Sequence, residues 1–198
     1  MDQSGRIVCL GWGSLIWDIN RPFDVKGDWQ NDGPSLPLEF ARQSQDNRMT
    51  LVIVDVGHHV PTLWAELDAA SLGDAITLLA KREGCRESAI GRWPNNSQKL
   101  YPNQDAIADW ATGKGLSGVV WTALKPGMKD NNRGVLPSLA EVEAHLSGLG
   151  DAERDRAIAY IYKAPGQIAT PYRSALENLF AFGERDERPT HPSSFSIS

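Results

Sequence analysis

A loop with two glycines interrupts an apolar stretch near the start of the chain. Residues 7–10 are apolar and run directly into a segment made of Gly11, Trp12, Gly13, Ser14 and Leu15. Glycine has no Cβ, so it tolerates a positive φ and lets another group approach the backbone closely. The bare N–H groups of such a loop can bind an anion or an oxyanion. The alternative is a tight turn between two core segments.

A carboxylate falls where a predicted helix should be apolar. The helix predicted over residues 71–83 has an apolar stripe at i, i+3, i+4 and i+7, formed by Leu72, Ala75, Ile76 and Leu79. On this helix Glu83 lies within about 20° of Leu72, which aims it at the core. Burial and the negative helix terminus both disfavour the charged form, so we expect a raised pKa and an acid–base role. The alternative is a solvent-facing Glu83 paired with Arg82 or Arg86.

A second polar segment lies between two predicted strands. Ser44, Asp46 and Arg48 alternate, so they would share one face if a strand continues through them. Arg48 is then a candidate to bind a substrate carboxylate. The alternative is a polar hairpin that holds a local ion pair.

Other nucleophile and metal sites receive less support from the sequence. Cys85 has no histidine placed beside it, so a small apolar role is the simpler interpretation. Ser14 as a nucleophile needs a base such as His145, and its loop is not a G-x-S-x-G elbow. His58 and His59 are adjacent and would point to opposite faces of a strand, which disfavours a metal site.

The order of the predicted elements favours an α+β fold. The predicted strands are residues 6–11, 36–44, 49–56, 62–68 and 117–124, and the predicted helices are residues 71–83, 138–149, 151–164 and 171–183. Residues 84–104 are predicted to form a long loop, with a short helix starting near Pro102. Strands come mostly first and helices later, which favours α+β over a doubly wound sheet. We expect one domain over residues 1–183 and a polar tail over residues 184–198.

Composition excludes several classes of protein. The 198 residues include 20 Lys and Arg against 25 Asp and Glu, a net charge of -5, with no basic stripe of the kind that nucleic-acid binding requires. No apolar run approaches the length of a membrane span, and the N-terminal residues do not resemble a signal peptide. Two cysteines do not make a disulfide framework. These features predict a soluble cytoplasmic protein.

Three segments together resemble the ChaC-type γ-glutamylcyclotransferases. "GWGSLIW" resembles their G-Y-G-S-L-x-W signature, and "FARQSQDNR" resembles their F-x-x-x-S-x-D-x-R segment through Phe40, Ser44, Asp46 and Arg48. "TLVIVD" and "TLWAELD" are followed by a helix ending in "KREG", and the family's acid–base glutamate ends that same helix. The matching position is Glu83. The resemblance covers roughly residues 6–84, with Trp12 in place of the family's tyrosine and a different segment after Glu83.

The resemblance implies a curled, barrel-like mixed sheet with packed helices, extended by a helical part over residues 138–183. It implies cyclisation of a small γ-glutamyl amide, with glutathione the first candidate, to 5-oxoproline and a free amine. Glu83 would be the catalytic residue, residues 11–15 and Arg48 would bind substrate, and no metal or organic cofactor is needed. The rival interpretation is a non-catalytic member of the fold that binds a ligand, or a protein partner through residues 138–183.

Overall fold

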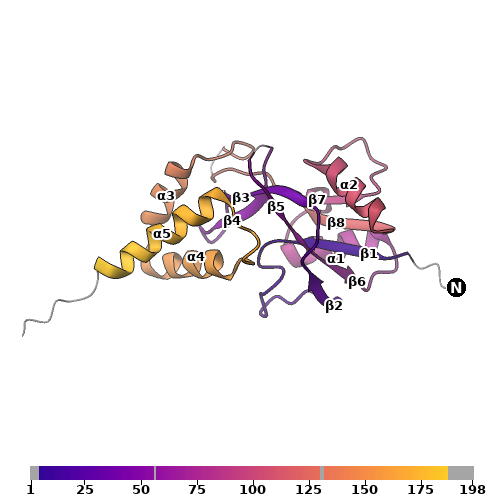
Figure 1. Cartoon of the computed structure of the whole chain (residues 1–198), viewed down its shortest axis with the longest axis horizontal. Coiled ribbons are helices and arrows are strands. Elements are labelled where there is room, and N and C mark those ends of the chain that lie inside the picture. Colours follow the sequence, from indigo (N-terminus) through magenta and orange to yellow (C-terminus); the bar gives the residue numbers. More distant parts are fainter. Residues whose placement is uncertain (1–4, 56, 130–131, 187–198) are drawn as a thin grey trace, which may run out of the picture.

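The structure is a computed structural model that describes residues 5–55, 57–129 and 132–186, and side chains as far as Ala181. Its described part is an α+β fold with a five-stranded sheet, a three-stranded sheet and five α-helices. Figure 1 shows α3, α4 and α5 gathered at one end of the molecule and α1 and α2 at the other. The strands are β1 (Ile7–Gly11), β2 (Val25–Gln30), β3 (Ser35–Gln43), β4 (Met49–Ile53), β5 (His59–Pro61), β6 (Leu63–Leu67), β7 (Ile90–Trp93) and β8 (Gly118–Thr122). The helices are α1 (Leu72–Glu83), α2 (Gln104–Gly113), α3 (Leu139–Ser147), α4 (Asp151–Lys163) and α5 (Pro171–Asp186).

The five-stranded sheet carries α1 and thereby positions Glu83. Its strand order is β2-β6-β1-β8-β7, with β1 antiparallel to β6 and parallel to β8. α1 starts at Ser71, whose side chain accepts the N–H of Asp74, and ends at Gly84, which has a φ of 63°. Only glycine adopts that left-handed backbone without strain. The apolar stripe of α1 packs with the sheet in one core cluster, so the end of the helix is held against the end of β1.

The three-stranded sheet carries the helical C-terminal part. Its order is β4-β3-β5, which leaves β4 at an edge. α5 docks through the buried Glu39 of β3, whose carboxylate accepts hydrogen bonds from the Thr170 hydroxyl at 2.5 Å and the Tyr172 N–H at 3.2 Å. These two hydrogen bonds hold the start of α5 against β3.

The structure confirms the α+β class and corrects several predicted boundaries. β2, β5 and β7 were not predicted, and β7 lies inside the predicted loop of residues 84–104. β2 is mostly exposed and polar, so its pairing with β6 leaves no apolar pattern to detect. The strand predicted over residues 49–56 ends at Ile53, and residue 56 lies outside the described residues. The predicted tail is wrong for residues 184–186, which continue α5, and the rest of that tail lies outside the described residues.

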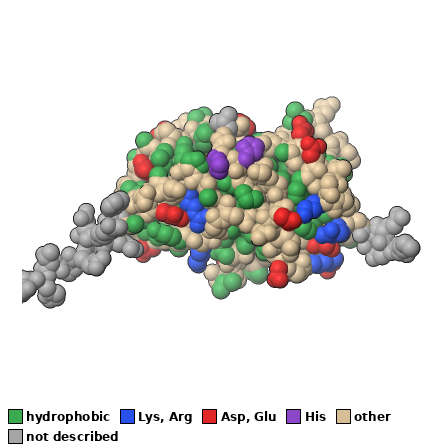
Figure 2. All heavy atoms as spheres, in the orientation of Figure 1, with side chains coloured by type: hydrophobic (Ala, Val, Ile, Leu, Met, Phe, Trp, Pro, Cys, Tyr) green, Lys and Arg blue, Asp and Glu red, His purple; other side chains and the backbone are tan. Residues whose placement is uncertain are grey.

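The distribution of charged side chains on the surface bears on the prediction that the chain lacks a basic stripe. On the face shown in Figure 2, the basic side chains lie scattered among acidic ones. Among the described helices, none has the length and apolar character required to cross a bilayer.

Candidate active site

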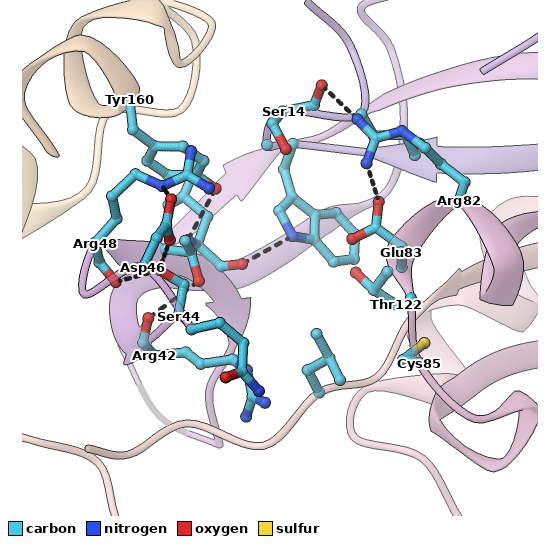
Figure 3. Close-up of a pocket in the computed structure, with 18 of the residues that line it drawn as sticks. Ser14, Arg42, Ser44, Asp46, Arg48, Arg82, Glu83, Cys85, Thr122 and Tyr160 are labelled. Carbon is cyan, nitrogen blue, oxygen red and sulfur yellow. Dashed lines mark hydrogen bonds and ion pairs between the residues drawn. The ribbon is translucent and has the colours of Figure 1, made fainter. Parts of the chain in front are cut away.

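All the residues predicted to form the site line one pocket of about 360 Å³. The pocket is built from the loop after β1, the hairpin between β3 and β4, the end of α1, the end of β8 with the segment that follows it, and one side chain of α4. In Figure 3, Ser14, Arg82 and Glu83 lie on one side of this space, and Arg48 and Tyr160 lie on the other. The predicted residues brought together here are Gly11, Trp12, Gly13, Ser14, Leu15, Arg48 and Glu83.

The loop after β1 lines the pocket with residues 12–15. Within the described part of the chain, the N–H groups of residues 12–15 donate no hydrogen bond. The loop is held instead through its carbonyls, since the Ile16 N–H donates to Gly13 at 3.0 Å and the Asp18 N–H donates to Ser14 at 2.9 Å. Free N–H groups on a fixed loop are suited to bind a carboxylate or an oxyanion.

The two glycines are needed for packing, which differs from the predicted reason. A Cβ at Gly11 would lie 2.5 Å from the Trp29 ring, and a Cβ at Gly13 would lie 2.6 Å from the Tyr160 hydroxyl oxygen. Neither glycine has a positive φ. The close approach that the sequence suggested is therefore made by two aromatic side chains of the chain itself.

Glu83 lies at the pocket wall beside a buried arginine. Its side chain is 20% exposed, and its Oε1 lies 3.1 Å from Nη1 of Arg82, whose side chain is only 4% exposed. Nη2 of Arg82 donates to the carbonyl oxygen of Ser14 at 3.0 Å. Arg82 therefore ties the carboxylate of Glu83 to the loop that carries the free N–H groups.

Two opposing effects set the protonation of Glu83. Burial is the main cause and raises its pKa, and the charge of Asp18 acts in the same direction. The Arg82 and Arg21 cations lower it, and the net result is a raised pKa. The raised pKa and the role of burial agree with the sequence prediction, whereas the second cause that raises it in the structure is the charge of Asp18 and not the expected helix terminus. The predicted pairing with Arg82 is also present, but it forms inside the pocket wall rather than in solvent.

Arg48 is engaged in the local ion pair that was the alternative interpretation. Its Nε lies 2.8 Å from Oδ2 of Asp46, and the Ser44 hydroxyl donates to the other carboxylate oxygen at 2.6 Å. The guanidinium also lies over the Tyr160 ring, 5.1 Å from its centroid. Ser44 and Arg48 close the hairpin through a backbone bond of 2.8 Å. Arg48 thus lines the pocket with much of its charge already balanced by Asp46.

The pocket nevertheless carries an excess of positive charge. Among the described residues that line it, two are carboxylates, Asp46 and Glu83, and five are arginines: Arg21, Arg42, Arg48, Arg82 and Arg133. Burial and the neighbouring Arg133 cation lower the pKa of Arg42. In the described part of the chain, Arg42 and Arg133 contact backbone carbonyls but no carboxylate. The wall of the pocket that Arg42 and Arg133 form is therefore suited to bind an anionic group.

The sequence analysis missed Arg82, Arg42, Arg133 and Tyr160 as pocket residues. Arg82 did carry a signal, because it lies seven residues after Ala75 and so falls on the same side of the helix. No sequence signal pointed to Tyr160 as a pocket residue, because the apolar pattern of residues 151–164 is that of any helix packed on a core.

The other candidates are not assembled into catalytic groups. Cys85 lines the pocket, but burial raises the pKa of its thiol, and no histidine is among the lining residues that the structure describes. Ser14 lines the pocket but His145 is not among the described lining residues, and its Nε2 contacts the Asn47 carbonyl at 2.7 Å. Among the described residues, no group of three His, Cys, Asp or Glu side chains is placed to hold a metal ion.

Comparison with protein-family models, curated proteins and solved structures gave no match.

Proposed function

We propose that this chain is a γ-glutamylcyclotransferase-like enzyme, with a related curled-sheet fold, that cyclises a small γ-glutamyl amide to 5-oxoproline and a free amine. The observation that carries the proposal is the shared pocket of Glu83 and residues 12–15. A carboxyl group with a raised pKa shares this pocket with a loop whose backbone N–H groups donate no hydrogen bond in the described part of the chain. These are the acid–base group and the oxyanion donors that an intramolecular acyl transfer needs.

The reaction forms one C–N bond and breaks another. Glu83 takes a proton from the substrate α-ammonium, and the freed amine attacks the γ-carbonyl carbon of the same molecule. The N–H groups of residues 12–15 stabilise the oxyanion that forms. As the γ-amide C–N bond breaks, Glu83 returns the proton to the leaving nitrogen. Glu83 then takes the second proton from the attacking nitrogen, which is now the ring nitrogen, and passes it to the departing amine. The attacking nitrogen thus loses two protons, and the amine, released as an ammonium, gains two.

Binding the substrate in a bent conformation supplies much of the rate. The attack is intramolecular, so a pocket that holds the chain of the substrate folded removes an entropic barrier of several kcal/mol. The wall of Arg42 and Arg133 favours a substrate whose leaving amine bears a carboxylate. Glutathione, which has a second carboxylate at that end, is the first compound to test.

The test is 5-oxoproline formation, followed by mass spectrometry, from a panel of γ-glutamyl peptides and γ-glutamyl amines. Matched α-glutamyl peptides serve as controls, since their free amine cannot reach the amide carbonyl in a five-membered ring. We expect product only from γ-linked compounds, and faster turnover when the leaving amine bears a carboxylate. A purified, folded protein that produces no 5-oxoproline from any of them contradicts the proposal.

A second candidate function is a non-catalytic binding protein with the same pocket. The observation that favours it is Trp12, whose indole N–H donates to the Leu51 carbonyl at 3.3 Å and so presents no polar group to a ligand. In that case γ-glutamyl compounds bind without turnover, and calorimetry detects binding where mass spectrometry detects no product.

A further inference from the structure

Tyr160 of α4 brings the helical C-terminal part into the pocket. The residue is only 5% exposed, and its ring packs edge-on against Trp17 and Phe40 with centroid distances of 5.5 Å and 6.2 Å. Figure 3 shows its hydroxyl pointing toward the space that Glu83 faces from the opposite wall. The helices predicted as a docking surface therefore contribute a side chain to the candidate site.

The edge of β4 holds this hydroxyl in place. Leu51 of β4 donates its N–H to the Tyr160 oxygen at 3.3 Å and accepts the Trp12 indole N–H at 3.3 Å. β4 is an edge strand, so these two aromatic side chains satisfy backbone groups that no neighbouring strand reaches. A phenol has one O–H donor besides its acceptor lone pairs. The N–H of Leu51 uses a lone pair and leaves the hydroxyl hydrogen free.

That hydrogen has no protein acceptor in the part of the chain that the structure describes. The hydroxyl oxygen lies against Gly13, in the space where a Cβ would be, and thus against the loop whose N–H groups donate no hydrogen bond in the described part of the chain. We infer that Tyr160 is a further catalytic residue, which donates its hydroxyl hydrogen to the γ-carbonyl oxygen of the substrate alongside those N–H groups. This inference rests on the proposed cyclisation.

The surroundings keep Tyr160 in the protonated form that can donate. Burial is the main cause that raises the pKa of its hydroxyl, and the charges of Glu83 and Asp46 act in the same direction. The Leu51 N–H and the Arg48 cation act in the opposite direction and are outweighed. Tyr160 therefore acts as a neutral hydrogen-bond donor, while Glu83 carries the proton.

The test compares Tyr160→Phe with Tyr162→Phe, its matched control on the same helix. Tyr162 is 50% exposed and does not line the pocket. Removing one oxyanion donor lowers kcat by about 10²–10³-fold, so we expect that loss for Tyr160→Phe, with a smaller change in KM. We expect wild-type kinetics for Tyr162→Phe. Circular dichroism and thermal unfolding show whether Tyr160→Phe, which also leaves the Leu51 N–H without its acceptor, is folded.

If Tyr160→Phe does not fold, replacing Tyr160 by 3,5-difluorotyrosine tests its role instead. It keeps the ring and the hydroxyl but ionises at lower pH, so the alkaline limit of kcat should move to lower pH, whereas the same replacement at position 162 should not move it. A folded Tyr160→Phe variant with wild-type kcat, or an unshifted alkaline limit, overturns the role of Tyr160 and leaves the cyclisation intact. A wild type without activity overturns both.

Discussion

Replacing Glu83 by glutamine separates catalysis from architecture. Glutamine keeps the size of the side chain and its carbonyl acceptor but cannot carry a proton. If Glu83 is the acid–base residue, we expect the turnover number to fall by about 10²–10⁴-fold, which corresponds to about 2.7–5.5 kcal/mol of barrier.

The structure predicts a much smaller effect of this change on stability. At 3.1 Å, the attraction between Glu83 and Arg82 is about 5 kcal/mol for an effective dielectric constant of about 20. The desolvation of a buried carboxylate costs several kcal/mol and is removed with the charge. The glutamine carbonyl can still accept from Arg82, a bond to a charged donor that contributes about 1.5–3 kcal/mol. These opposing effects nearly cancel, and we expect the free energy of unfolding to change by less than about 2 kcal/mol.

The assay pairs steady-state kinetics with urea unfolding on the same preparation. A protein of ordinary stability, about 5–15 kcal/mol, remains about 99% folded after a loss of 2 kcal/mol, so unfolding cannot mimic the kinetic effect. An active wild type whose Glu83→Gln variant keeps its turnover refutes the mechanism. A Glu83→Gln variant whose urea midpoint lies far below that of the wild type refutes the expectation that the loss of the Arg82 ion pair is nearly cancelled.

Three further predictions concern neighbouring groups. Arg82→Met removes the cation that lowers the pKa of Glu83, so the acidic limb of the pH profile of kcat/KM should move to higher pH, and an unshifted limb contradicts the coupling. Gly13→Ala places a Cβ 2.6 Å from the Tyr160 hydroxyl and should lower the free energy of unfolding by about 1–3 kcal/mol. In the Tyr160→Phe background, which lacks that oxygen, urea unfolding should show a smaller loss. If the losses from the two substitutions simply add, the clash is contradicted. Burial raises the pKa of Glu39, so its contribution to stability is complete below the unfolded value of about 4.3 and falls as the pH rises toward the folded value. Glu39→Gln should therefore make the decline of the unfolding free energy above that pH less steep, as measured by urea unfolding across a pH series.

Local patterns in the sequence determined a large part of the fold and of the site. The stripe from Leu72, the cap at Ser71 and Gly84 after the last turn define α1 and direct Glu83 toward the core. These signals are local, because a helix and its caps are formed by residues a few positions apart. The two-glycine loop was recognisable for the same reason, and so was the α+β order of the elements.

The tertiary structure decided which groups meet in the pocket. Arg82 donates a hydrogen bond to Ser14, which is 68 positions away in the sequence. Leu51 accepts a hydrogen bond from Trp12, 39 positions away, and donates one to Tyr160, 109 positions away. No periodic pattern encodes such pairs, since they depend on the register of two sheets and on where α4 packs. β2 and β7 were missed for a related reason, because their pairing is set by the neighbouring strands rather than by their own composition. The sequence alone therefore identified the carboxylate, and the packing of distant segments supplied the arginine and the tyrosine around it.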